Sequence, residues 1–182
     1  MKISAGRVAG FVANPDPGIT AILVYGPNAG LVREHCNSLA LCILDDPGDP
    51  FRAAELTGAA IMETPTRLAD ELLALSFGGD RRLVTVRDAT DGLTKSLESA
   101  LDAGVEAEMN AVALIEAGAL TGRSSLRKLC EKRDDCAALP CYADDEEARA
   151  RLARGLLTEA GIGIDPEALR TLTGFLGDDR LS

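Results

Sequence analysis

The fold of this 182-residue chain is decided by the stretch Ala21-Ile22-Leu23-Val24-Tyr25-Gly26-Pro27-Asn28-Ala29-Gly30. Its first five residues are all apolar, without the alternation of a half-exposed strand, and this is typical of a strand that is buried on both faces. The Gly-Pro-Asn-Ala-Gly segment breaks the strand, and helical spacing follows over 31–44. A strand, a glycine-rich loop and a helix in this order predict the first unit of a parallel sheet.

Four further strand candidates alternate with helical segments. The alternation of apolar strands with helical crossovers predicts an α/β fold with a five-stranded parallel sheet that is covered on both faces. Ser4, Thr64 and Ser124 are expected N-caps, with Pro65 as the first residue of its helix. The predicted strands are 51–56, 82–87, 111–115 and 136–142, and the predicted helices are 4–13, 64–75, 92–103 and 124–133.

The pattern changes near Tyr142, after which no strand signal remains. An acidic run at 144–147 suits the first turn of a helix that reaches to about 160, and Asp165-Pro166 is expected to cap a further helix to Leu176. We therefore predict a boundary between an α/β domain, 1–142, and a small helical domain, 143–182. The second domain is expected to be incomplete, since the sequence stops just after a Gly-Asp-Asp turn.

Composition excludes several classes of function. A net charge of −10 excludes a basic nucleic-acid surface over the whole domain, although a local basic patch stays open. Aromatic residues are 3% of the chain, which disfavours base-stacking platforms. No apolar run approaches the roughly 20 residues that span a bilayer, and the N-terminus lacks a secretory signal, so we expect a cytoplasmic protein without membrane contact. Arg81-Arg82, Arg123 and Arg127-Lys128 are interpreted as solvated charges, with contact to DNA as the alternative.

The five cysteines are expected to be reduced and mostly buried. Their number is odd and they form no CxxC pair, which suits intracellular thiols. A zinc site that includes the single histidine, His35, is the alternative, but the gaps between the cysteines are too long for common structural sites. We therefore expect no metal and no cofactor. The cysteines are Cys36, Cys42, Cys130, Cys136 and Cys141.

The loop Gly26-Pro27-Asn28-Ala29-Gly30 occupies the topological place of a phosphate-binding P-loop. A working loop reads GxxxxGK[ST], in which the Lys binds phosphates and the hydroxyl binds magnesium. Counting from Gly26, Val32 takes the place of the Lys and Arg33 that of the Ser/Thr, and the spacing between the glycines is one residue short. Arg33 or Arg87 could supply charge, but the metal-binding hydroxyl has no counterpart. We predict a degenerate loop.

The acidic motif that accompanies a P-loop, the Walker B motif, is also incomplete. The strand 111–115 is followed by Glu116 alone, where a Walker B motif would end in an Asp-Glu pair. Ser124-Ser125 suits a helix N-cap better than a nucleophile, because no histidine is near in sequence. We therefore expect no catalysis. A divergent P-loop ATPase or kinase with Glu116 as the acid is the alternative.

An ordered set of segments resembles the delta subunit of bacterial DNA polymerase III, the clamp-loader subunit. The similarity runs through nearly the whole chain, including its closing segments 164–169 and 176–181. The segments that carry it are 25–34, 49–52, 72–82 (LLALSFGGDRR), 86–89, 125–129 and 140–142.

The resemblance implies an AAA+-type domain of the P-loop fold, a helical lid, and a role in DNA replication. Delta subunits bind the sliding clamp, the beta subunit, and favour its opened ring without hydrolysing ATP. They join the other loader subunits through a C-terminal domain that this chain lacks, and they meet DNA indirectly within the polymerase complex.

The resemblance also implies a contact site for the clamp. The family's Leu-Phe plug matches Ser76 and Phe77, with Leu75 just before. Ser76 departs from the expected large apolar residue, and Leu75 could replace it by a small rotation. From the residues alone, Phe77 could instead pack in the core between helix and strand. A scaffold subunit without clamp contact also stays open.

Overall fold

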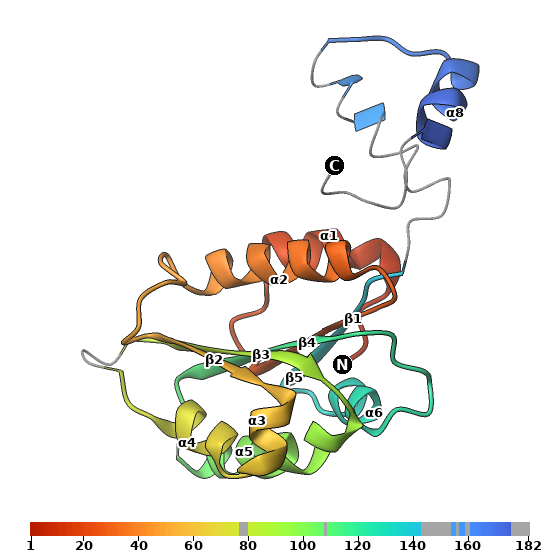
Figure 1. Cartoon of the computed structure of the whole chain (residues 1–182). Helices are drawn as coiled ribbons and strands as arrows, with labels where there is room; N and C mark the ends of the chain where they lie inside the picture. The colour runs from red at the N-terminus through yellow and green to blue at the C-terminus, as the bar shows by residue number, and fades with distance from the viewer. Residues whose placement is uncertain (77–79, 108, 143–153, 156, 159–160, 176–182) are drawn as a thin grey trace. The chain divides into compact units, whose positions relative to one another are not determined.

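The computed structural model describes residues 1–76, 80–107, 109–142, 154–155, 157–158 and 161–175. Contacts divide the chain into two compact units, Met1–Cys141 and Tyr142–Ser182. The first unit is a sheet with helices on both faces (Figure 1).

The sheet of the first unit contains five parallel strands, which confirms the predicted fold class. Their order in space is β2-β3-β4-β1-β5, so that β4 lies in the centre. Because the strands are parallel, they all begin at one edge, here the start edge (Ala21, Ala53, Arg82, Ala111, Cys136), and finish at the other, the end edge (Tyr25, Thr57, Ala89, Ala117, Pro140). Their bounds are β1 Ala21–Tyr25, β2 Ala53–Thr57, β3 Arg82–Ala89, β4 Ala111–Ala117 and β5 Cys136–Pro140.

Helices cover the two faces unequally. Figure 1 shows α1 (Ala5–Ala13) and α2 (Ala29–Ile43) together on one face, and the other helices of this unit on the opposite face. These other helices are α3 (Gly58–Glu63), α4 (Arg67–Leu73), the 3-10 turn η1 (Asp91–Leu93), α5 (Thr94–Glu106) and α6 (Ser125–Lys132). Both faces are therefore covered, as continuous apolar strands require.

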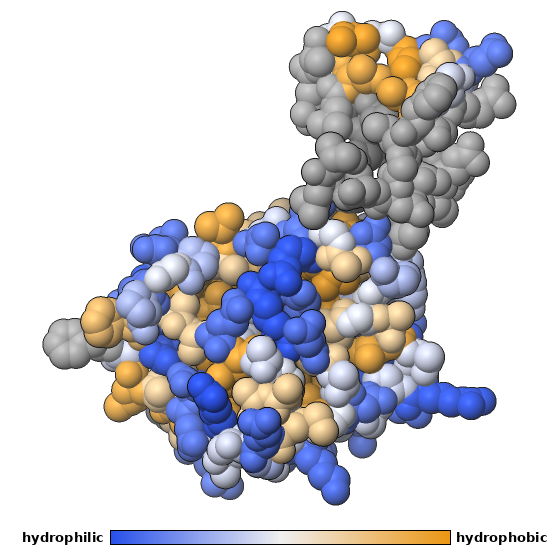
Figure 2. All heavy atoms as spheres, viewed as in Figure 1, coloured by the Kyte–Doolittle hydropathy of each residue, from blue (hydrophilic) through white to orange (hydrophobic). Residues whose placement is uncertain are grey.

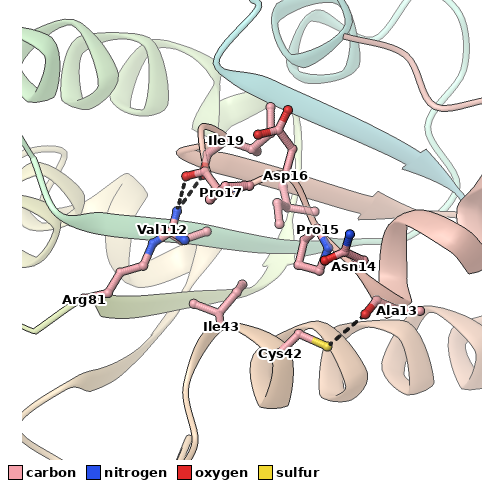
Figure 3. A pocket seen from close by; sticks show the side chains of 11 residues that line it. Ala13, Asn14, Pro15, Asp16, Pro17, Ile19, Cys42, Ile43, Arg81 and Val112 are labelled. Carbon is pink, nitrogen blue, oxygen red and sulfur yellow. Dashed lines mark hydrogen bonds between the residues drawn. The ribbon is translucent and has the colours of Figure 1, made fainter.

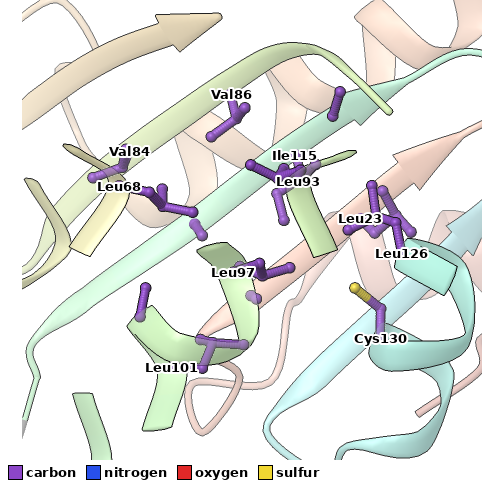
Figure 4. Close-up of a cluster of buried hydrophobic side chains, with 14 of the residues drawn as sticks. Leu23, Leu68, Val84, Val86, Leu93, Leu97, Leu101, Ile115, Leu126 and Cys130 are labelled. Carbon is purple, nitrogen blue, oxygen red and sulfur yellow. The ribbon is translucent and has the colours of Figure 1, made fainter. Parts of the chain in front are cut away.

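The core is two apolar layers separated by the sheet. All five residues of β1 are buried, and they alternate between the layers: Leu23 and Tyr25 face α3 to α6, whereas Ile22 and Val24 face α1 and α2. Figure 4 shows the first layer, where leucines of α4 to α6 pack on β1, β3 and β4. The run 21–25 lacks alternation because each face meets its own layer.

The segment after β2 differs from the prediction of one helix over 64–75. It forms α3 and α4, with Thr64 as the C-cap of α3 and Thr66 as the N-cap of α4. The reason is local: the Thr57 side chain accepts a hydrogen bond from the Ala60 N–H at 3.2 Å, and this caps a helix directly after the strand. The predicted cap at Ser124 is confirmed, since its hydroxyl accepts from the Arg127 N–H at 3.2 Å.

In the second unit, the described helix is α8 (Pro166–Phe175). The Asp165 carboxylate accepts hydrogen bonds from the N–H groups of Glu167 and Ala168, both at 2.9 Å, which confirms the predicted cap with proline at the first position. The acidic helix predicted from 144 lies mostly outside the described residues. Among the helices that are described, none is both long and apolar enough to cross a membrane.

Candidate functional site

The degenerate loop lies at the end edge, between β1 and α2. Asn28 is the N-cap of α2, and its side-chain oxygen accepts a hydrogen bond from the Leu31 N–H at 3.0 Å. Ala29 and Gly30 already belong to the helix. The loop therefore lies between a strand and a helix, as a phosphate-binding loop does. One N–H group at the start of the helix, that of Leu31, already donates to the Asn28 side chain.

Gly26 is packed against the chain that leaves β5. The Cys141 N–H donates to the Tyr25 carbonyl at 2.7 Å, and a Cβ atom placed on Gly26 would lie 1.7 Å from the Cys141 carbonyl oxygen. No side chain fits at this position. A glycine is thus required here by the close approach of two backbone segments, whatever the loop binds.

The two positions that would bind nucleotide in a working loop hold residues that pack in the core or form an ion pair. Val32, in the place of the Lys, is buried in the layer beneath α2. Arg33, in the place of the hydroxyl, reaches Glu116 on β4, where its Nη2 lies 3.0 Å from Oε1. The residue that should hold magnesium carries a positive charge and is paired with the candidate acid.

Glu116 is held by two arginines at once. Its Oε2 lies 2.7 Å from Nη1 of Arg87 on β3, while Oε1 meets Arg33. Arg87 also pairs with Glu55 on β2 at 2.9 Å, and this hydrogen bond lowers the pKa of Glu55. We call Arg33, Glu55, Arg87 and Glu116 the charge cluster. It balances two cations against two carboxylates, which are carried by α2, β2, β3 and β4.

The Cys36 thiol, which lies near the charge cluster, is not activated as a nucleophile. Burial, with a smaller contribution from nearby Glu116, raises the pKa of the Cys36 thiol to about 12, so the nucleophilic thiolate is not formed at neutral pH. Cys36 and Cys141 lie in one apolar layer and Cys130 and Cys136 in the other, so the sheet separates them. Within the described parts of the chain, no three His, Cys, Asp or Glu side chains gather as a metal site.

Sequence reasoning missed a further acid at the end edge. Asp88, near the end of β3, has a backbone φ of 53°, in the left-handed region that short polar side chains tolerate. A Cβ on Gly58 would lie 2.7 Å from the Asp88 carbonyl oxygen, so β3 bends close to the start of α3 here. The signal that could have found it is the Arg-Asp pair closing an apolar strand.

Two of the three predicted clamp-contact residues, Leu75 and Ser76, lie at the opposite, start edge. Leu75 follows α4 and its side chain is 95% exposed. Ser76 is half-buried, and its hydroxyl donates a hydrogen bond to the Asp80 carbonyl, so it bridges the segment before β3. Phe77 lies outside the described residues. The degenerate loop and Glu116 therefore lie at the end edge of the sheet, whereas Leu75 and Ser76 lie at the start edge.

The basic residues that were interpreted as solvated are largely engaged in the fold. Arg81 donates to the carbonyls of Pro17 and Ile19, both at 3.0 Å, beside a hollow of about 270 Å³ (Figure 3). Arg82 is 9% exposed and pairs with Glu71 at 3.1 Å. The Arg127 guanidinium lies 5.2 Å from the centre of the Tyr25 ring. The interpretation was wrong for these three side chains, because the acceptors of Arg81 and Arg82 and the ring beside Arg127 reach them only in the folded chain.

The strand order and the strand–loop–helix unit define the first unit as an α/β domain with a five-stranded parallel sheet and a P-loop-type connection, in which the residues that would bind phosphate are replaced. No family model matches the chain. It is 26% identical over 163 residues to the probable DNA polymerase III subunit delta of Rickettsia prowazekii (strain Madrid E), covering 88% of this chain and 46% of that protein. Its structure superposes on the clamp loader delta protein YqeN of Bacillus subtilis with a TM-score of 0.60 and 18% identity, covering 93% of this chain and 51% of that one.

The sequence comparison confirms the resemblance to the delta subunit of DNA polymerase III. The structural comparison confirms the fold. The chain spans about half the length of these two proteins.

Proposed function

We propose that this chain is the clamp-binding part of a clamp-loader delta subunit that works in DNA replication in the cytoplasm. Residues 1–142 form the AAA+-like domain and 143–182 begin the helical lid. The chain binds one side of the ring-shaped sliding clamp. Because it binds the opened ring better than the closed ring, it shifts the ring toward the open state. In the whole protein, a further C-terminal domain would join the other loader subunits, and DNA would be met only within the assembly.

The observation that carries this proposal is the exposure of Leu75. A leucine that is 95% exposed at the end of a helix gains nothing for folding, because its apolar surface stays in water. It lies one residue before the position at which the resemblance to delta subunits places an apolar plug. An exposed leucine that enters a pocket of a partner would bury this surface.

The absence of ATP hydrolysis in this proposal rests on the charge cluster. Both carboxylate oxygens of Glu116 accept hydrogen bonds from arginines, at 3.0 Å from Arg33 and 2.7 Å from Arg87. Both oxygens of the carboxylate are therefore already engaged where a magnesium ion or an attacking water would need one of them. The alternative of a divergent ATPase or kinase, with Glu116 as the acid, therefore has no observation in its favour.

The test is binding of the clamp by Leu75→Ala and Phe77→Ala variants. We expect each to weaken binding by tens-fold, since truncation of a central apolar anchor costs about 2–4 kcal/mol. Leu75→Ala should leave the melting temperature unchanged because the side chain is exposed. Met62→Ala, which truncates an exposed side chain on α3, is the matched control.

Two results would count against the proposal. Wild-type affinity in both variants would mean that the clamp is not bound at this edge. A large fall in the melting temperature of Phe77→Ala, with unaltered clamp affinity per folded molecule, would make Phe77 a core residue.

A further inference from the structure

Exposed large apolar side chains gather at the start edge of the sheet. Among the described residues of the first unit, six such side chains are exposed, and four of them lie where strands begin or where the preceding helix ends. Figure 2 shows hydrophobic atoms interspersed with hydrophilic ones on the left-hand edge of the first unit, which is the edge where β2 and β3 begin in Figure 1. The four are Leu41, Phe51, Leu75 and Val105. The end edge, with its charge cluster, has no comparable grouping among the described residues.

Phe51 is the aromatic member of this group and is 70% exposed. Its backbone is fixed on both sides: its N–H donates to the Asp49 carboxylate at 2.8 Å, and its carbonyl accepts from Nη1 of Arg82 at 2.6 Å. The next two N–H groups both donate to the Asp49 carbonyl. A ring on such a fixed turn is presented to solvent with little backbone entropy left to lose on binding.

Arg82 connects Phe51 to the segment that carries Leu75. Its guanidinium donates to the Phe51 carbonyl and also to Glu71 on α4, at 3.1 Å. β2 and β3 are direct neighbours, with Ala53 opposite Leu83, and parallel neighbours run about 4.8 Å apart. The turn before β2, with Phe51, and the start of β3, with Arg82, therefore lie side by side at the start edge, and Arg82 also contacts the helix that Leu75 follows.

We propose that Phe51 is a second anchor for the sliding clamp, beside the contact made by Leu75. This inference rests on the proposed function and extends the same contact from the segment before β3 to the turn before β2. The partner surface that fits is an apolar hollow of the clamp adjacent to the pocket that takes Leu75. Aromatic side chains that pass from solvent into such hollows are frequent hot spots of binding energy.

The experiment compares Phe51→Ala, Leu75→Ala and Met62→Ala in the whole 182-residue chain, with clamp affinity and melting temperature measured for each. We expect Phe51→Ala to weaken clamp binding by about tenfold or more and to leave the melting temperature unchanged. Met62 is 61% exposed but belongs to α3, which follows β2 at the end edge, so Met62→Ala should behave as wild type in both measurements.

The outcomes separate this inference from the function on which it rests. If Leu75→Ala weakens binding and Phe51→Ala binds as tightly as Met62→Ala, the second anchor is refuted and the proposed function stands. If the wild-type chain does not bind the clamp, or if Leu75→Ala and Phe77→Ala both bind it normally, the proposed function and the second anchor are both refuted. A fall in melting temperature that accounts for the lost affinity of Phe51→Ala would also overturn the inference.

Discussion

At the scale of the residue, the degenerate loop shows that a glycine in a phosphate-loop position can serve packing alone. Gly26 has no room for a Cβ atom, because the Cys141 carbonyl oxygen would lie 1.7 Å away. A Cβ atom added to Gly10, in the middle of α1, would meet no other part of the fold within 4 Å. These two glycines therefore make a matched pair for testing the packing role.

We expect Gly26→Ala to lower the free energy of unfolding by about 3 kcal/mol, since backbone must move to relieve the overlap. Gly10→Ala should raise it by about 0.5–1 kcal/mol, because alanine favours the helix and loses less entropy on folding. Urea denaturation of both variants measures the two effects. Equal stabilities for Gly26→Ala and wild type would show that the two backbone segments do not approach as closely as described.

At the scale of the element, η1 and α6 are joined through one carboxylate. Asp91 in η1 accepts hydrogen bonds from the Ser124 hydroxyl at 2.5 Å and from the Leu126 N–H at 3.1 Å. These hydrogen bonds, that of Ser124 first, lower the pKa of Asp91. The negative charge also lies at the N-terminus of α6, where the helix dipole favours it.

This cap predicts a pH dependence with a definite sign. A carboxylate whose pKa is lowered by folding stabilises the protein above its unfolded pKa, and this stability is lost as the pH falls through the folded pKa. Wild type should therefore be more stable than Asp91→Asn at neutral pH, and the difference should shrink below about pH 4, where this carboxyl begins to be protonated in the unfolded chain. Urea denaturation across this range checks it. A difference that is independent of pH would exclude the carboxylate as the cap.

At the scale of the whole molecule, the sheet separates a charged edge from an apolar one. The end edge has the charge cluster and the degenerate loop, and the start edge has the exposed side chains Phe51 and Leu75. A nucleotide would have to bind at the end edge, where the Lys and the hydroxyl of a working loop are replaced by Val32 and Arg33. Each lost charge-assisted contact to phosphate removes about 1.5–3 kcal/mol of affinity.

We accordingly expect ATP with magnesium to leave the unfolding transition unchanged. A ligand present at about 1,000 times its Kd would add about 4 kcal/mol to the free energy of unfolding, so ATP at about 1 mM would reveal a micromolar site clearly. Thermal denaturation with and without the nucleotide is the measurement, and sulfate with magnesium at the same ionic strength is the control. A rise of several degrees with ATP alone would restore the ATPase alternative.

Much of the fold could be predicted from local sequence. The continuous apolar runs 21–25 and 111–115 indicated buried strands, because only a strand covered on both faces keeps every side chain out of water. The missing Lys and hydroxyl after Gly26 were equally visible, since the chemistry of a phosphate loop depends on residues within a few positions. Boundaries were harder to predict: the Asp49 turn delays β2 to Ala53, and the Thr57 cap starts α3 early.

The strands, most of the helices and the loss of the phosphate-binding residues could be read from the chain alone, for these depend on near neighbours in sequence. The order of the strands, the pairing of Arg33 with Glu116 and the packing of Cys141 on Gly26 became visible only in the folded molecule. The same is true of the burial of Arg82, whose guanidinium lies on the Phe51 carbonyl and Glu71. Each of these contacts joins segments that are separated in sequence, and a charged side chain gives no local sign of the acceptor that folding will bring to it.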